Sequence, residues 1–203
     1  MTAMILDERM TERLIAERRR LGLDNHDEVW DGVYVMSPSP TNDHQDVVSD
    51  FVSLFRKVIP RPSRVQPGAN VSDRAAGWEH SFRVPDVVVV LPGCPAVDHG
   101  THWQGGPDFL VEVRSPGDDT FRKLDFYAGV GVRELLVVDR DGRTPQLFRL
   151  GRTRLSRVRP ALLDGQPWLI SQVLPLAFAR GVSKGKPRPL VRRTAGAART
   201  WKV

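Results

Sequence analysis

The sequence is poor in cysteine, in long apolar runs and, near its end, in acidic residues. Its one cysteine, Cys94, excludes an internal disulfide and a zinc site built from several cysteines. No segment approaches the roughly 18–20 uncharged apolar residues that span a bilayer, which excludes a transmembrane protein. Residues 1–20 alternate acids with bases and lack the apolar core of a signal peptide. We therefore expect a cytoplasmic protein without membrane contact.

Acidic residues are absent after Asp164, whereas residues 183–203 carry seven basic side chains. The net charge of +6 therefore leaves the rest of the chain at −1. This C-terminal segment contains few apolar residues, and Gly185, Pro187 and Pro189 interrupt it, so we predict a mobile tail unless it docks on a second subunit. Two interpretations stay open: a solvated end, or a basic tail that binds nucleic acid by neutralising phosphates.

The length of 203 residues and the apolar content of 40% predict one domain with a real core. We divide the chain into an N-terminal helix within 1–24, a domain over 25–182 and a basic flexible tail over 183–203. Four consecutive valines from 87 to 90 indicate a strand that is buried on both faces. Such a strand needs helices on both sides of its sheet, so the fold class is α/β, with a three-layer mixed core.

The expected elements follow from apolar periodicity and from turn residues. Helices are predicted over 7–20, 41–58, 119–130 and 169–179. A hairpin with an Asp-Gly turn is predicted over 28–36, and the segment 93–106 is predicted to be a loop. Further strands are predicted over 65–71, 84–91, 109–113, 135–139 and 146–150, the last two joined at a second Asp-Gly turn.

Two carboxylates stand in or beside strands that are otherwise apolar. Asp86 begins the valine strand, and Glu112 lies inside the apolar run that starts at Phe109. A buried carboxylate needs a counter-charge or a bound cation. Because residues i and i+2 share one face of a strand, Arg114 can project into the same pocket as Glu112. A simple ion pair between these two residues is the purely structural alternative.

A lysine, Lys123, follows these carboxylates on the next predicted helix. Two oxygen ligands at adjacent strand ends suit Mg²⁺ or Mn²⁺. A lysine beside them can orient a water molecule and stabilise the charge on a phosphate. The set of Asp86, Glu112 and Lys123 therefore predicts a site for phosphodiester hydrolysis.

The same segments, taken together, resemble the Uma-two family of restriction-endonuclease-like proteins in the PD-(D/E)XK nuclease superfamily. The resemblance extends over about residues 25–180, and its segments follow in family order and spacing: 28–40, His44-Gln45, 84–90, 108–116 and 123–139. It implies a restriction-endonuclease-like core, with a central mixed β-sheet flanked by helices, and a metal-dependent endonuclease that hydrolyses DNA.

Residue by residue, the resemblance implies that Asp86 and Glu112 bind the metal ion and that the Val113 carbonyl joins them. Arg114 stands where the superfamily has its lysine, whereas Lys123 matches the lysine that Uma-two proteins often place on the next helix. Both stay candidates for the residue that positions the attacking water.

Two further residues are candidates for the cleft. His44 matches the His-Gln pair of the family, and packing at the start of its helix is the alternative. Many relatives carry a Glu after the Gly of the hairpin, where this sequence has Val33. Glu28 is then the nearest acidic side chain for a third ligand.

The expected partner is DNA, and a homodimer is expected because cutting both strands usually requires two active sites. Basic residues follow the second predicted helix and fill the tail, and we take the following as DNA-binding candidates: Arg56, Lys57, Lys184, Lys186, Arg192 and Arg193. The charge of −1 outside the tail keeps an alternative open, namely an inactive nucleic-acid-binding or interaction protein with the same fold.

Overall fold

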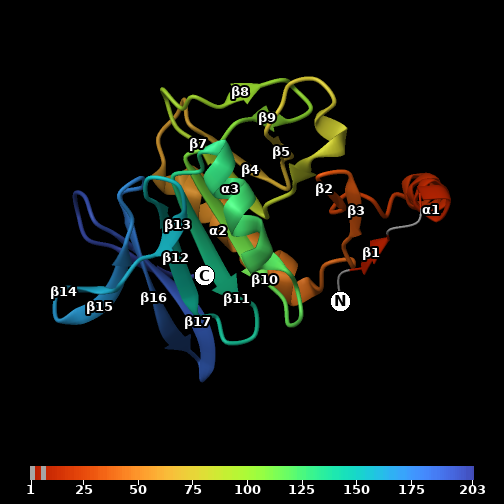
Figure 1. Cartoon of the computed structure of the whole chain (residues 1–203). Coiled ribbons are helices and arrows are strands. Elements are labelled where there is room, and N and C mark those ends of the chain that lie inside the picture. The colour runs from red at the N-terminus through yellow and green to blue at the C-terminus, as the bar shows by residue number, and fades with distance from the viewer. Residues whose placement is uncertain (1–2, 6–7) are drawn as a thin grey trace.

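The computed structural model describes residues 3–5 and 8–203 and shows helices packed on β-sheets (Figure 1). Within these residues the strands form sheets of seven, six and five strands. The six-stranded sheet is central, with the order β13-β12-β11-β10-β7-β4. Its strands are β4 (Arg64–Pro67), β7 (Val87–Val90), β10 (Phe109–Arg114), β11 (Glu134–Asp139), β12 (Pro145–Leu150) and β13 (Leu155–Arg157). The predicted mixed α/β fold is confirmed.

The central sheet is mixed because β10 and β11 are parallel, whereas β7 and β12 run antiparallel to them. The valines of β7 are buried on both faces, as predicted: Val87 and Val89 belong to one apolar cluster, and Val88 and Val90 belong to another. Helix α2 contributes to the first cluster and helix α3 to the second, so the two helices cover opposite faces of the sheet.

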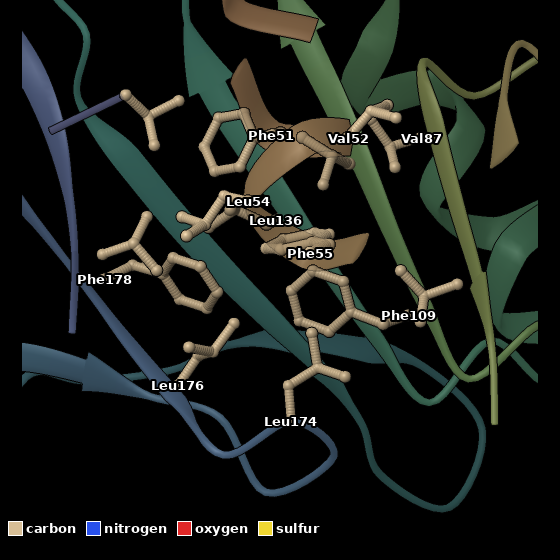
Figure 2. Close-up of a cluster of buried hydrophobic side chains, with 14 of the residues drawn as sticks. Phe51, Val52, Leu54, Phe55, Val87, Phe109, Leu136, Leu174, Leu176 and Phe178 are labelled. Carbon is tan, nitrogen blue, oxygen red and sulfur yellow. The ribbon is translucent and has the colours of Figure 1, made fainter. Parts of the chain in front are cut away.

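Helix α2 (Asn42–Val58) begins after Thr41, whose hydroxyl accepts a hydrogen bond from the His44 amide at 3.4 Å. Its phenylalanines enter the core shown in Figure 2, where the Phe55 ring meets the Phe109 ring of β10 edge-on at 5.9 Å. This packing fixes the first turn of α2, which carries His44, relative to β10.

The predicted helix over 119–130 is a 3₁₀ turn (Thr120–Lys123) followed by α3 (Leu124–Val130). Helix α3 ends at Gly131, which adopts the left-handed conformation with φ 93°. Tyr127 is the fully buried side chain of this helix, against the sheet. Lys123 therefore lies at the junction between the 3₁₀ turn and α3.

The seven-stranded sheet packs beside the central one, in the order β1-β3-β2-β6-β5-β9-β8. Its first hairpin turns at Asp31-Gly32, with φ 49° and 86°, as the sequence predicted. The predicted strand over 65–71 is two strands in different sheets, and the predicted loop over 93–106 contains two short strands. The bounds are β1 (Ala3–Ile5), β2 (Glu28–Trp30), β3 (Val33–Met36), β5 (Val71–Ser72), β6 (Phe82–Arg83), β8 (Val97–Asp98) and β9 (Trp103–Gln104), with a 3₁₀ turn at Trp78–His80.

Helix α1 (Glu8–Leu21) stands at the edge of the molecule, next to β1 (Figure 1). Arg18 ties its last turn to the body: the guanidinium donates to Asp27 at 2.5 Å and to the Ser37 carbonyl at 3.1 Å. None of the helices in the described residues has the length and apolar character needed to cross a membrane.

The predicted helix over 169–179 is wrong, because this segment contains a turn between two strands. The Ser171 hydroxyl accepts hydrogen bonds from the amides of Val173 (3.1 Å) and Leu174 (2.8 Å), and Pro175 offers no amide hydrogen. The five-stranded sheet that results has the order of its numbering: β14 (Ala161–Leu163), β15 (Gln166–Ile170), β16 (Leu176–Ser183), β17 (Lys186–Arg193) and β18 (Thr200–Lys202).

The prediction of a flexible tail over 183–203 is also wrong, because β17 and β18 continue this sheet. Lys184 and Gly185, with φ 48° and 76°, form a two-residue hairpin turn, and β17 pairs with β16 along its whole length. Val191 and Val203 are buried in the main core. They add apolar contacts that a count of charged residues does not reveal. The Gly that we interpreted as a break is therefore a turn residue.

Candidate functional site

A cavity of about 300 Å³ opens at the end of the central sheet. Asp86 precedes β7 and Glu112 lies near the end of β10, and the register that pairs Val87 with Val111 brings the two acids side by side. The remaining wall comes from the β2–β3 hairpin, the segment that joins it to α2, the first turn of α2 and the segment before α3. Most of the predicted site residues line this one cavity: Glu28, His44, Asp86, Glu112, Val113 and Lys123.

Asp86 is held at the cavity wall through one of its oxygens. Its Oδ2 accepts a hydrogen bond of 2.6 Å from the Val113 amide and lies 3.3 Å from His44 Nε2. Burial lowers the pKa of His44, but the hydrogen bond and charge of Asp86, together with Glu112, outweigh it and raise the pKa. Within the described residues, no hydrogen bond reaches Asp86 Oδ1, which leaves this oxygen for another ligand.

Glu112 is 4% exposed and is also engaged through one oxygen. Its Oε1 accepts hydrogen bonds from the Tyr127 hydroxyl at 2.6 Å and from Lys123 Nζ at 3.1 Å. Burial raises its pKa to about 8; Lys123 opposes this shift, whereas the charges of Asp86 and Glu28 add to it. Negative charge thus exceeds what one lysine balances, a surplus that a divalent cation would relieve.

Lys123 bridges two carboxylates, because its Nζ also donates to Glu28 Oε1 at 2.7 Å. Burial lowers the pKa of this lysine, yet the charges of Glu112 and Glu28 prevail and raise it. Lys123 therefore stays protonated at neutral pH. A protonated lysine can orient a water molecule or a phosphate oxygen, but it cannot accept the proton of that water.

Both oxygens of Glu28 are occupied by protein donors. Besides Lys123, its Oε1 accepts from the Val84 amide at 2.8 Å, and its Oε2 accepts from Trp30 Nε1 at 2.7 Å. This arrangement suits an anchor for Lys123 better than the third metal ligand that we considered for Glu28.

Arg114 does not line the cavity. Its guanidinium lies 3.9 Å from Asp118 and from Asp139, and it stacks over the Phe121 ring at 5.1 Å. The prediction that Arg114 projects into the same pocket as Glu112 is wrong, because the strand ends at Arg114 and its long side chain turns toward these two acids. Of the two candidates for the water-positioning residue, Lys123 is the one that reaches Glu112.

The predicted DNA-binding residues are dispersed. Arg56 lies 12 residues beyond His44 on α2, about 18 Å along the helix. Its guanidinium donates to the Val65 carbonyl at 3.0 Å, and Lys57 follows it at the same far end. Arg192 is half-buried and pairs with Asp164. The other candidates are exposed: Arg56 and Lys57 near the end of α2, Lys184 and Lys186 at the hairpin turn, and Arg193 at the other end of β17.

Sequence reasoning missed Tyr127 and Arg83. Tyr127 follows Lys123 by four residues, so both project from one helical face, and this spacing could have identified it. Arg83 is buried between the rings of Trp30 and Phe126, at 4.9 and 4.1 Å, close enough to Glu28 to feel its charge. No local sequence signal separates Arg83 from an ordinary strand arginine.

The site has the donors for a hydrated divalent ion rather than for a closed metal shell. No group of three or more His, Cys, Asp and Glu side chains in the described part of the chain could hold a metal alone. Asp86 and Glu112 each keep one oxygen without a hydrogen bond from those residues, and Val113 lines the same cavity. Mg²⁺ commonly binds through one or two carboxylates and retains waters, so the residues present fit this ion.

Comparisons with known proteins identify the family and the fold. Residues 17–183 match the model of the Uma2 family, which is described as "Putative restriction endonuclease". Among solved structures, the chain is similar to one from Anabaena variabilis, described as a "putative nuclease belonging to DUF820", with a TM-score of 0.53 and 19% identity over 68% of this chain and 80% of that chain. Comparison with curated proteins finds no match. Because the family model spans most of the sequence, the chain belongs to the Uma2 family and has a restriction-endonuclease-like fold.

Proposed function

We propose that this protein is a metal-dependent endonuclease that hydrolyses phosphodiester bonds of DNA. The observation that carries the proposal is the arrangement of Asp86, Glu112 and Lys123 around one cavity, in which Lys123 Nζ lies 3.1 Å from Glu112. Two carboxylates with free oxygens beside a fixed cation suit the charge of a phosphodiester and its divalent counterion.

Asp86 and Glu112 would hold Mg²⁺ or Mn²⁺, joined by the Val113 carbonyl. The bound ion would stabilise negative charge on the phosphate and make a bound water more acidic. Lys123, fixed by Glu28, supplies a permanent positive charge beside the attacking water or the scissile phosphate. His44, whose Nε2 lies 3.3 Å from Asp86, would orient this carboxylate.

The proposal includes DNA as the partner and the cytoplasm, where DNA is accessible, as the place of action. Exposed Lys184 and Lys186 would contact its backbone outside the cavity. A homodimer would supply the second active site that cleavage of both strands requires. Light scattering at several protein concentrations, with and without DNA, tests this part separately.

Cleavage of supercoiled plasmid tests the catalytic proposal. We expect nicking or linearisation with Mg²⁺ or Mn²⁺, none with EDTA, and loss of cleavage in Glu112→Gln and Asp86→Asn. The matched controls are Glu79→Gln and Asp50→Asn, whose side chains are exposed and lie outside the cavity. Equal cleavage by all four variants would indicate a contaminating nuclease and contradict the proposal. DNA binding without cleavage in either metal would support the inactive nucleic-acid-binding protein instead.

A further inference from the structure

Arg143 lies in the loop between β11 and β12 and differs from three other arginines in or beside these two strands. Arg149 lies 2.7 Å from Glu134, Arg133 lies 2.9 Å from Asp108, and Arg140 lies 2.8 Å from Asp141. Arg143 is only 9% exposed, yet within the described residues no carboxylate lies within 4 Å of it. A nearly buried guanidinium without a counter-ion is costly, which points to an anion that the chain itself does not provide.

The donors of Arg143 are also poorly satisfied. Its Nη2 lies 3.5 Å from the Asp43 carbonyl, at the limit of a hydrogen bond, and its Nη1 is buried without an acceptor in the described residues. The backbone of Arg143 is left-handed, with φ 50°, a conformation that costs a non-glycine residue free energy. Backbone strain together with unmet side-chain hydrogen bonds in one residue is typical of binding sites.

A second arginine reaches the same place from β17. The β16–β17 hairpin starts near the beginning of β10, where the Phe178 ring stacks on the Phe109 ring at 5.8 Å. In Figure 1 the turn of this hairpin and the loop after β11 both lie at the lower edge of the view. Arg188, opposite Gly181 in the register, is near enough to Arg143 for its charge to act on that guanidinium. Burial lowers the pKa of Arg143, and the positive charge of Arg188 lowers it further.

Neither arginine has its charge neutralised by an ion pair. Asp43 and Asp141 raise the pKa of Arg143 from a distance, but both stay beyond 4 Å. Arg188 forms no ion pair or side-chain hydrogen bond with the described part of the chain. Guanidinium groups with free donors are the side chains that bind phosphate groups through paired hydrogen bonds.

The arginine pair lies beside the cavity. Arg143 contacts the carbonyl of Asp43, and the next residue, His44, lines the cavity wall. Arg140, three residues before Arg143 in the same loop, lines it as well. A nucleic-acid strand that placed one phosphate in the cavity would therefore pass the arginine pair with a neighbouring phosphate.

We propose that Arg143 and Arg188 together bind one phosphate of the DNA backbone next to the phosphate that enters the cavity. This inference rests on the proposed function, since it takes DNA as the substrate. The β16–β17 hairpin would thus contribute to DNA binding through Arg188. Arg192 does not take this role, because Asp164 already neutralises it. The ligand is a phosphodiester, so contact with it does not depend on base sequence.

The test measures DNA binding without cleavage, by fluorescence anisotropy of a labelled duplex in EDTA at several salt concentrations. Arg143→Gln and Arg188→Gln are each expected to weaken binding about three- to tenfold and to reduce the log–log salt slope by about 0.9. Because both residues bind one phosphate, the double variant should lose about 0.9 as well, not twice that amount. Arg154→Gln is the control, since this exposed arginine lies in the β12–β13 turn, at the other end of the sheet.

An unchanged slope in Arg188→Gln, an equal loss in Arg154→Gln, or no duplex binding by the unaltered chain would overturn the inference. Arg188 is only half-buried, so its variant keeps the test valid if Arg143→Gln fails to fold. The binding readout separates this inference from the catalytic proposal. Arginine-dependent binding without any cleavage would support the phosphate site and contradict the proposed nuclease activity. Cleavage with arginine-independent binding would support the nuclease activity and contradict the phosphate site.

Discussion

Glu112 and Glu134 are buried glutamates on the neighbouring parallel strands β10 and β11, yet their surroundings differ. Glu134 is 0% exposed, and both its oxygens are bound: Oε1 accepts from Arg149 (2.7 Å) and from the Gln172 amide (3.0 Å), and Oε2 accepts from the Ser171 hydroxyl. Glu112 has donors on one oxygen alone and shares its lysine with Glu28. Glu134 therefore belongs to a complete structural ion pair, whereas Glu112 lies in a site that has too little positive charge.

The comparison teaches how to separate a structural buried acid from a functional one. Burial is nearly equal in the two cases, so burial alone does not distinguish them. What distinguishes them is how fully their oxygens are hydrogen-bonded. A structural carboxylate has a hydrogen-bond donor for each oxygen and a positively charged partner of its own. A carboxylate that keeps a free oxygen among excess negative charge is poised for a ligand from outside the chain.

Exchanging each glutamate for glutamine should separate activity from stability, and the largest effect is expected on activity. Glu112→Gln removes the metal-binding charge, so cleavage should fall by about 10²–10³-fold or more, as for loss of a group that stabilises transition-state charge. Plasmid nicking rates at saturating Mg²⁺ measure this loss. Folded Glu134→Gln protein should keep a nicking rate within a few-fold of the unaltered chain, and a comparable loss there would erase the distinction.

The reverse order is expected for stability. Glu134→Gln leaves Arg149 without its partner, which should cost about 2–3 kcal/mol, less than the ~3–5 for fully buried pairs because Arg149 is 28% exposed. Urea denaturation at pH 7 in EDTA measures the free energy of unfolding. Glu112→Gln should lose much less, because with a pKa of about 8 Glu112 is mostly uncharged at pH 7, and glutamine is a neutral side chain of nearly the same size. A greater loss of stability in Glu112→Gln than in Glu134→Gln would contradict the comparison.

The pH dependence of stability should also follow Glu112. Its pKa is about 8 in the folded chain against an ordinary 4.5, so between these values the native state binds more protons than the unfolded state. Stability of the metal-free protein should therefore decrease as the pH rises from about 5 to about 8, by at most ~1.4 kcal/mol per pH unit from this group. Thermal melts in EDTA should show a shallower decrease in Glu112→Gln, with Glu79→Gln as the control. Parallel curves for all three proteins would contradict the shift.

The sequence predicts the acidic half of the site well and its surroundings poorly. Asp86, Glu112 and Lys123 are conspicuous because charged residues stand in or next to apolar strands, and chain order alone places them together. Tyr127 looks like one more core aromatic until the structure shows its hydroxyl 2.6 Å from Glu112. Which acid lacks a donor depends on contacts between distant segments, such as Ser171 with Glu134, and no local pattern reports these.

The C-terminal sheet shows the same limit for the fold. Seven basic residues suggested a solvated tail, because counting charges ignores where the apolar residues lie. Val191 and Val203 reach the core only after the Lys184-Gly185 turn folds β17 back on β16. The predicted helix over 169–179 and the predicted tail are both wrong because these segments form strands through long-range pairing. Helix α2 was predicted correctly, because its cap and its regular apolar spacing are local signals.

The smallest effect is expected from Tyr127→Phe, which changes only the hydrogen bonding of Glu112. Burial is the main cause of the raised pKa of Glu112, and the Tyr127 hydroxyl works against it by stabilising the carboxylate. Loss of one hydrogen bond of this kind is worth about 0.5–1.5 kcal/mol, so the pKa should rise further by up to about one unit. A metal ion needs the ionised carboxylate, and cleavage at pH 7 should therefore fall a few-fold and recover at higher pH. Nicking rates from pH 6 to 9 test this, with Phe126→Leu as a control for packing in α3. An unchanged rate, or an equal decrease at every pH, would show that the Tyr127 hydroxyl does not set the ionisation of Glu112.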